Sequence, residues 1–531
     1  MHRRRGSRSA SGTESKFAAR RQRGWAAALG GLVCFTAAGD ALADNWTGSA
    51  SAGGTETYNH YSGADQPSDG FVTSLTGLLA IHGQGARFKL NGTVGGTEEL
   101  YSGQGQSDSF APYVNLVANL EAIEKFLYVD ATANVTQTFI SPFGAQPANL
   151  TTPSNNRYTS ETYSVSPYLK GVIAPDITYY LRDDNVWTPS TTYGNSSAKV
   201  PTTYLNNLNG QVDSPAKPWG WTLQYSGQDY DNGIISDKYI VQVARAIVSY
   251  QFDPQFTLSG RGGYQIDRFA VSPTIEGAIY GFGMDWRPTD RTVVDGYWEH
   301  QFFGSAYSWQ LSHRLPNVAL SANFSRGLNS YPQSALLIPA GVNVAQFLDA
   351  AFATRIPDPA ERAAAVAEFL AQTGLPPTLI SPINFYASTI TLQELASFTA
   401  AWVGARNSLA FTVFRLESKQ ITGQGTPLPP ALQFGVNNTQ SGGEVSYSHR
   451  LTAITSLVAS AIYTTTTPID NETALGSLRT KNINATVAAS TQFTPKTNGS
   501  VGVTYFKFET PGSSIGSQST LGVYASLFHT F

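Results

Sequence analysis

The sequence contains few charged residues and only one cysteine. Asp, Glu, Lys and Arg make up 13% of its 531 residues, whereas a soluble globular chain has about 25%. The cysteine, Cys34, lies in a basic and apolar N-terminal segment. The remainder of the chain has no thiol, which excludes disulfides, thiol catalysis and cysteine-ligated metals there.

Long apolar runs are also missing. No run reaches the roughly 18 residues that a transmembrane helix needs, and the mean hydropathy is −0.17. Aromatic residues nevertheless make up 12% of the chain, which also has 49 glycines. This combination is typical of a membrane β-barrel, in which lipid-facing residues alternate with polar ones. The formal net charge of −3 gives no basis for a nucleic-acid partner.

The N-terminus has the features of a Sec-type signal peptide. A basic region from Arg3 to Arg23 precedes the apolar stretch Trp25–Ala38, and Ala41-Leu42-Ala43 follows with small residues. We therefore expect a signal peptide over residues 1–43, cleaved after Ala43, and a mature chain over 44–531. A membrane anchor is the alternative, but the apolar stretch is too short to span a bilayer.

From Trp46 onward, apolar and polar residues alternate with a period of two. In Phe126–Phe139, Leu127 and Val129 share one face, while Tyr128 and Asp130 share the other. This period predicts strands with one apolar and one polar face. Half-buried sheets of soluble proteins show the same alternation, so the pattern alone leaves both classes open.

The connections between the expected strands favour the membrane barrel. Short turns such as Glu124-Lys125 alternate with long polar connections such as Ser141–Tyr158, as in outer-membrane barrels, whose long loops face outside. The fold class expected is all-β: an antiparallel transmembrane β-barrel of about 22 strands (range 18–24) with a short helical insert. Its last strand, Leu521–Phe531, is expected to pair with Trp46–Tyr61 and close the barrel, with both ends of the mature chain in the periplasm.

One segment, residues 331–391, interrupts the strand pattern. Two helices are predicted, at Asn343–Thr354 and Pro359–Gln372, the second with Asp358 as its N-cap. By strand order the insert leaves the barrel on the extracellular side. Apolar side chains on both helices would be exposed there, so we expect them to fold into the mouth or lumen as a constriction or plug; they include Phe347, Phe352 and Phe369.

The polar faces of the strands predict the lining of a water-filled lumen. Mixed charges in that lining indicate no strong ion preference. No nucleophile or metal motif accompanies the histidines, so we predict no enzyme activity, no cofactor and no metal site. The predicted pore-lining residues are Arg87, Lys89, Tyr128, Asp130, Arg245, Arg261, Asp295, Tyr297 and Glu299.

Seven short segments of turns and strand ends carry a joint resemblance: Tyr163–Leu169, Pro218–Trp221, Gly263–Asp267, Gly283–Thr292, Phe303–Tyr307, Pro357–Arg362 and Gly404–Leu409. In these segments the chain resembles a known family, the outer-membrane β-barrel proteins associated with the PEP-CTERM/exosortase and exopolysaccharide system of Gram-negative bacteria. The resemblance covers nearly all of the expected mature chain and implies an outer-membrane barrel associated with polysaccharide export. It carries no known activity or site residues.

The function expected is porin-like passage or export of a saccharide or exopolysaccharide across the outer membrane. The expected partners are outer-membrane lipid, a polysaccharide cargo and export components. A non-conducting structural, display or adhesion barrel is the alternative, and it would present long loops such as Ser141–Tyr158 outside. The sequence does not determine the oligomeric state.

Overall fold

The computed structural model describes most of the chain beyond the expected signal peptide. Residues 1–43 lie outside the described part, and so do parts of the expected insert at 331–391. The described residues are 45–63, 69–102, 107–192, 199–233, 238–269, 274–330, 333, 342–353, 356–373, 375–376, 378–383, 390–421, 437–469, 479–511 and 517–531.

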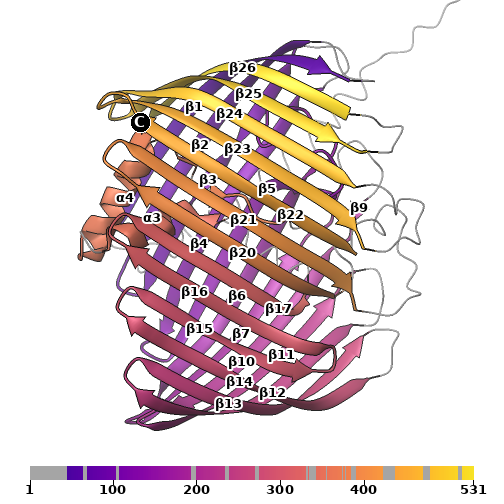
Figure 1. Cartoon of the computed structure of the whole chain (residues 1–531), viewed down its shortest axis with the longest axis vertical. Coiled ribbons are helices and arrows are strands. Elements are labelled where there is room, and N and C mark those ends of the chain that lie inside the picture. The colour runs from indigo at the N-terminus through magenta and orange to yellow at the C-terminus, as the bar shows by residue number, and fades with distance from the viewer. Residues whose placement is uncertain are drawn as a thin grey trace, which may run out of the picture.

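Twenty-two of the strands form one antiparallel sheet, and each pairs with its neighbours in chain order (Figure 1). Two short ribbons, β8–β9 (Thr191–Thr192, Lys199–Val200) and β18–β19 (Val342–Asn343, Thr378–Leu379), lie outside it. The strands of the large sheet are β1 (Asn45–Ser62), β2 (Gly70–Gln84), β3 (Phe88–Tyr101), β4 (Ser109–Ile123), β5 (Leu127–Phe139), β6 (Arg157–Ala174), β7 (Ile177–Thr188), β10 (Thr203–Ser214), β11 (Trp219–Asp231), β12 (Tyr239–Asp253), β13 (Phe256–Phe269), β14 (Ile275–Thr289), β15 (Thr292–Gln301), β16 (Gly304–Leu315), β17 (Val318–Asn329), β20 (Thr391–Val403), β21 (Asn407–Gln420), β22 (Asn438–Arg450), β23 (Thr455–Pro468), β24 (Thr480–Thr494), β25 (Thr497–Glu509) and β26 (Ser517–Thr530).

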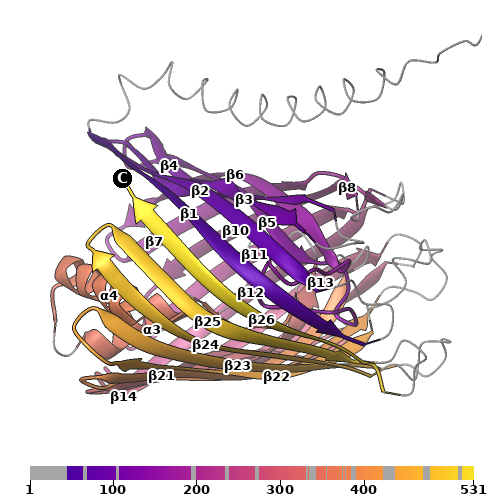
Figure 2. The same cartoon turned by 90° about the horizontal axis from the view of Figure 1, so that it is seen from above.

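The sheet closes on itself, because β26 pairs with β1 from Ser51↔Thr530 to Ser62↔Ser519. Figure 2 shows the two strands side by side. Closure pairs the exposed edges that an open sheet would leave. The predicted fold class and the predicted closing pair are therefore confirmed.

The two ends of the barrel differ in their connections. Short turns join the strands at one end, as between Thr494 and Thr497, and long connections join most of them at the other, as between Gln420 and Asn438. We call these the turn end and the loop end. The strand β1 begins and β26 ends at the turn end, which lies on the left in Figure 1.

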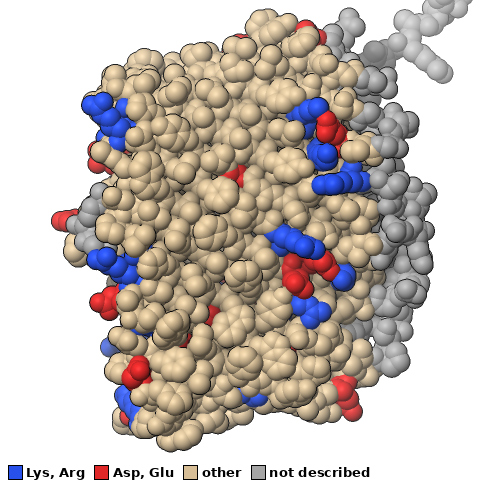
Figure 3. Space-filling view, in the orientation of Figure 1, with Lys and Arg blue, Asp and Glu red and all other residues tan. Residues whose placement is uncertain are grey.

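The outer face of the barrel is apolar between its two ends. On β26 the outward residues Leu521, Val523 and Leu527 are 45%, 50% and 55% exposed. In the space-filling view, Lys, Arg, Asp and Glu gather towards the two ends and leave the middle almost bare (Figure 3). Aromatic rings group near the turn end, where the ring centroids of Trp219 and Phe252 each lie 4.8 Å from that of Tyr250. An apolar band bordered by aromatic rings is the surface of an outer-membrane-type transmembrane barrel.

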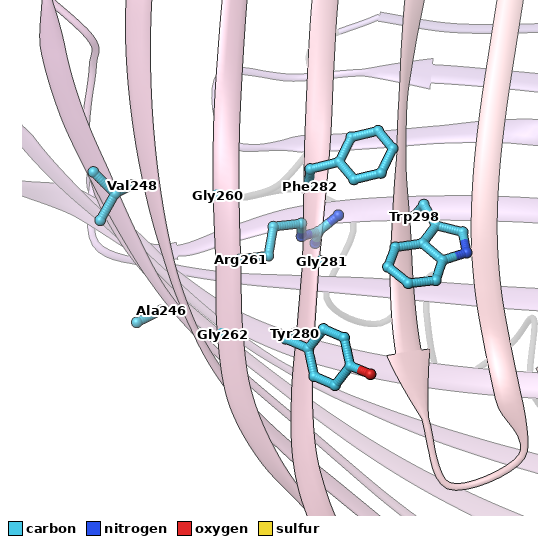
Figure 4. A pocket seen from close by; sticks show the side chains of 9 residues that line it. All are labelled: Ala246, Val248, Gly260, Arg261, Gly262, Tyr280, Gly281, Phe282 and Trp298. Carbon is cyan, nitrogen blue, oxygen red and sulfur yellow. The ribbon is translucent and has the colours of Figure 1, made fainter.

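A hollow of about 570 Å³ lies on this outer face over β12–β15 (Figure 4). Glycine causes it, because a Cβ atom placed at Gly260 would meet nothing within 4 Å. Val248 lies on one side of the hollow, and Tyr280 and Phe282 lie on the other. These side chains face the lipid, so the hollow is separate from the lumen.

The helices of the insert are α3 (Val344–Phe352) and α4 (Pro359–Thr373). Each has a side-chain N-cap: Asn343 accepts from the Gln346 amide at 3.3 Å, and Asp358 accepts from the Glu361 amide at 2.9 Å. The predicted Asp358 cap is therefore present in the structure. None of the described helices is long and apolar enough to cross a membrane.

The position of the helices corrects the expectation from strand order. The strand before the insert, β17, ends at the loop end, but α3 and α4 lie at the turn end (Figure 1). There Val344, Leu348 and Phe352 pack into a socket of small inward residues that includes Ala319 and Ala410. Burial of this apolar helix face explains why the insert crosses the lumen instead of staying at the extracellular mouth.

Candidate functional site: the lumen

Two parts of the inner wall differ in what covers them. Most of the inward side chains of β20–β24 are buried and the others are partly exposed; Thr412, Ser446 and Ser456, for example, are at most 1% exposed. On β2–β7 the inward side chains near the turn end are accessible, and Val117 is 38% exposed. We call the inward face of β20–β24 the covered wall and that of β2–β7 the open wall.

The covered wall binds the backbone of a long connection. Residues 140–156, which we call the lumen loop, follow β5 and fold inside the barrel. The Asn482 side chain accepts a hydrogen bond from the backbone N–H of Gln146 at 2.9 Å, and the Asn484 side chain accepts one from the backbone N–H of Ala148 at 2.8 Å. Asn484 also donates to the Gln146 carbonyl at 3.1 Å. These bonds satisfy loop backbone groups that would otherwise be buried without partners.

Further contacts hold the lumen loop from other sides. Asn59 of β1 donates to the Thr151 carbonyl at 2.8 Å, and Thr466 of β23 donates to the Pro142 carbonyl at 2.8 Å. Arg157 donates to loop carbonyls, one of them that of Pro147 at 2.7 Å. The expectation that Ser141–Tyr158 is presented outside is therefore wrong. Inward amides and hydroxyls of distant strands bind this connection, and they are not adjacent to it in the sequence.

The insert covers the same wall closer to the turn end. After α4 and β19 the chain runs along β22, where Glu444 accepts from the Ile380 amide at 2.6 Å. Gln440 accepts from the Ile383 amide at 2.8 Å and donates to its carbonyl at 3.2 Å. The described segment 378–383 of the insert therefore lines the lumen after the helices at the turn end.

A cavity of about 670 Å³ remains between these segments. The lumen loop, residues 378–383 of the insert and the inner faces of β5 and β22–β26 enclose it. Its polar lining includes Glu444, Asn484 and Tyr524. This volume is in the range of small-molecule binding sites.

The open wall carries a row of tyrosines near the turn end. Tyr128, Tyr168 and Tyr180 come from the adjacent strands β5, β6 and β7, and we call them the tyrosine ladder. The rings of Tyr128 and Tyr168 are stacked with centroids 5.1 Å apart, and those of Tyr168 and Tyr180 are 5.9 Å apart. Such spacing is favourable for aromatic pairs, so the ladder is a stable aromatic surface facing the lumen.

Charged groups border the ladder. The Lys170 ammonium lies 4.4 Å from the centre of the Tyr128 ring, and the Arg182 guanidinium lies 5.2 Å from that of Tyr168. Arg182 is also ion-paired with Asp130 at 2.7 Å and with Asp184 at 2.6 Å. The open wall therefore offers aromatic surface with hydrogen-bond donors and acceptors beside it, which suits a ligand with both apolar CH faces and hydroxyl groups.

A second charged cluster lies on the inner face of β12–β15. Glu299 is completely buried; it accepts from Arg245 at 2.9 Å and Gln301 at 3.0 Å, and it is ion-paired with Arg261 at 3.0 Å. Arg261 also lies 4.0 Å from the centre of the Tyr297 ring. The carboxylate is saturated by its neighbours, so this cluster links strands of the wall and leaves few groups free for a solute.

The other predicted residues lie apart from these clusters. Arg87 lies in the turn before β3, half-exposed, with an ion pair to Glu124 at 2.9 Å. Lys89 is inward and exposed near the turn end, and Asp295 is inward on β15. Phe352 and Phe369 meet edge to face at 5.4 Å between α3 and α4, and Phe347 packs beside them; none of the three belongs to the cavity lining.

Several residues of the ladder and of the charged groups that border it were not predicted as pore-lining: Tyr168, Lys170, Tyr180, Arg182 and Asp184. Alternation could have indicated them, since Ser164, Ser166 and Tyr168 share one face of β6. The run Arg182-Asp183-Asp184-Asn185 hides the same signal, because its charges lie on both faces. Asp184 points inward, whereas Asp183 points outward and accepts from Asn206 at 2.6 Å.

No family model and no curated protein matches this sequence. Among solved structures, the FrpB iron transporter of Neisseria meningitidis (F3-3 variant) is 11% identical over 93% of this chain and 82% of its own, with a TM-score of 0.44. OprD of Pseudomonas aeruginosa is 9% identical over 92% and 96%, with a TM-score of 0.32. OccK5 (OpdH) of the same species is 7% identical over 91% and 98%, with a TM-score of 0.32. Sequence identities and TM-scores this low do not support an argument from these structures. The class of this protein, an outer-membrane-type barrel, is therefore assigned from its own strand pairing and outer surface.

Proposed function

We propose that this chain is a porin-like channel of the outer membrane that admits saccharides. The observation that carries the proposal is the asymmetric lumen: one wall is covered by the lumen loop and the insert, and the other presents accessible polar and aromatic groups. A hydrated path beside fixed groups is sufficient for passive passage. The turn end then faces the periplasm and the loop end faces outside.

The tyrosine ladder supports a sugar as the solute. A sugar ring has CH faces that pack on aromatic rings and hydroxyls that exchange hydrogen bonds with charged groups. Tyr168 supplies an aromatic ring, and Asp130, Arg182 and Asp184 supply polar groups beside it. Export of an exopolysaccharide is the finer form of this proposal, and it rests on the family resemblance of the sequence segments.

Liposome swelling tests the proposal. Proteoliposomes containing the full mature chain are diluted into isotonic solutions of sugars of increasing size. We expect rapid swelling with monosaccharides and slower swelling with larger oligosaccharides, because the lumen is partly filled. No swelling with any solute would refute the channel and favour the structural or display barrel. Labelled polysaccharide inside the vesicles tests the export form, which predicts its release.

A further inference from the structure

The outward charges at the loop end are not distributed evenly around the barrel. Near the loop ends of β1–β11 the outward carboxylates include Glu56, Glu98, Glu161 and Asp229. Lys238, the nearby outward lysine, is ion-paired with Asp229 at 3.1 Å. The outward cations instead concentrate on β21–β25, on the side of the barrel that Figure 3 shows.

We call this concentration the basic arc. It contains five cations and two carboxylates, which leaves three positive charges at neutral pH. Its members are Arg415, Glu417, Lys419, Arg479, Lys481, Lys507 and Glu509. Glu417 interacts with both Arg415 and Lys419, and Glu509 interacts with Lys507.

Small hydroxyl residues separate the cations. In one row across the strands, Arg415 is opposite Ser441, Ser441 is opposite Thr465, and Thr465 is opposite Lys481. Three strand spacings place Arg415 and Lys481 about 14 Å apart at the backbone. Arg479 donates to Thr465 at 3.1 Å. The row is therefore a strip of hydroxyl groups between two cationic ends, wide enough for an anionic head group.

The basic arc directly adjoins the lipid-facing band. Next to this row on the turn-end side, the outward residues include Val413 and Tyr463, which are 38% and 42% exposed. A molecule bound across both regions must combine anionic groups with apolar chains. Lys and Arg close to the apolar band are the groups that hold anionic lipid head groups, and Arg also binds phosphate through paired hydrogen bonds.

We propose that the basic arc binds the phosphate groups of an anionic lipid in the outer leaflet. In this arrangement the phosphates contact Arg415, Lys481 and Lys507, the hydroxyls of Ser441 and Thr465 donate to phosphate oxygens, and the acyl chains cover the apolar wall. This site is independent of transport through the lumen, so either proposal can fail without the other.

Lipid binding by the basic arc can be tested by native mass spectrometry. The full mature chain in detergent is titrated with diphosphoryl lipid A. The variant Lys481→Gln with Lys507→Gln should bind the lipid about five-fold more weakly for each cation removed, because each contributes about one kcal/mol near an anionic surface. Arg415→Gln should weaken binding by a similar factor. Heat-modifiable migration on gels checks that each variant is folded.

A matched control is Lys217→Gln, which removes a cation that is also ion-paired, with Asp176 at 3.1 Å, but lies at the turn end. Its lipid binding should equal that of the native chain. Equal binding by the native chain and the double variant would overturn the proposal, and so would an equal loss in the control. Displacement of the lipid by an equal concentration of inorganic phosphate would also overturn it, because the site would then bind the free ion.

Discussion

The open wall and the covered wall belong to the same sheet and share the same alternation, but their inward residues differ in size. Much of the covered wall presents small residues, such as Thr412 and Ser446, which leave space for another segment of the chain. The open wall presents Tyr, Lys and Arg, such as Tyr168 and Lys170, which project into water. In this barrel, small hydroxyl residues and amides bind the inserted segments on the covered wall, and aromatic and basic residues occupy the accessible part of the open wall.

Removing the insert from the covered wall should have the largest effect. Leu348 is 1% exposed in the α3 socket, and Leu348→Asp would bury an unpaired charge there, at a cost of several kcal/mol. We expect α3 to leave the socket and the single-channel conductance in planar bilayers to rise about two-fold or more. Gln346→Asp, on the exposed side of α3, should leave conductance unchanged. Native conductance in Leu348→Asp would show that the insert does not restrict the lumen.

Loosening the lumen loop should have the next largest effect. Asn482→Ala with Asn484→Ala removes three hydrogen bonds to the loop backbone, at about 1 kcal/mol each. We expect a higher mean conductance with frequent transitions between levels, because the loop then leaves the wall part of the time. Thr467→Ala, an outward position on the neighbouring strand β23, is the control. If the single-channel current of the double variant shows the same steady conductance as the native chain, other contacts are sufficient to hold the loop on the wall.

On the open wall, truncating the tyrosine ladder should weaken solute binding without altering the pore size. Tyr128→Ala with Tyr168→Ala removes a stacked pair, and the loss of about 1 kcal/mol of contact per ring corresponds to about five-fold weaker binding for each. Current block by oligosaccharides measures this. Tyr447→Ala removes an outward tyrosine and should not alter block. Unchanged block in the ladder variant would exclude these rings from the solute path.

The smallest effect is expected from the charge balance of the open wall. Arg182→Gln leaves Asp130 and Asp184 without their shared cation. The ratio of K⁺ to Cl⁻ permeability should therefore rise, by about two-fold at low salt and less at high salt because of screening. Reversal potentials in a KCl gradient give this ratio. Arg415→Gln, on the outer face, should not change it, and a fall in the ratio for Arg182→Gln would contradict the assignment of these carboxylates to the path.

The sequence predicted the parts of this structure that depend on short-range pattern. The period of two indicated the strands and their apolar face, and the alternation of short and long connections indicated the barrel and the number of strands. The final strand was correctly paired with the first, because an unpaired edge is unfavourable and barrel closure removes it. The capping residue Asp358 was evident from local chemistry alone.

The contents of the lumen could not be predicted in the same way. The lumen loop is bound by Asn482 and Asn484, more than 300 positions away in the chain, and no local pattern links an amide on one strand to a distant backbone. The α3 socket combines Ala319, Val403 and Ala410 from three strands. Both depend on which inward faces meet across the barrel, and this is set only after closure.

The sequence by itself determined a closed, lipid-facing barrel with a helical insert, because alternation, capping and turn chemistry act between residues close in the chain. The tertiary structure decided which wall is covered, at which end the helices lie and which tyrosines align. Those outcomes depend on the packing of side chains from distant strands inside a closed cylinder. The same closure placed Arg415 and Lys481 on one row of the outer surface. The sequence around either residue does not predict that the two lie on one row.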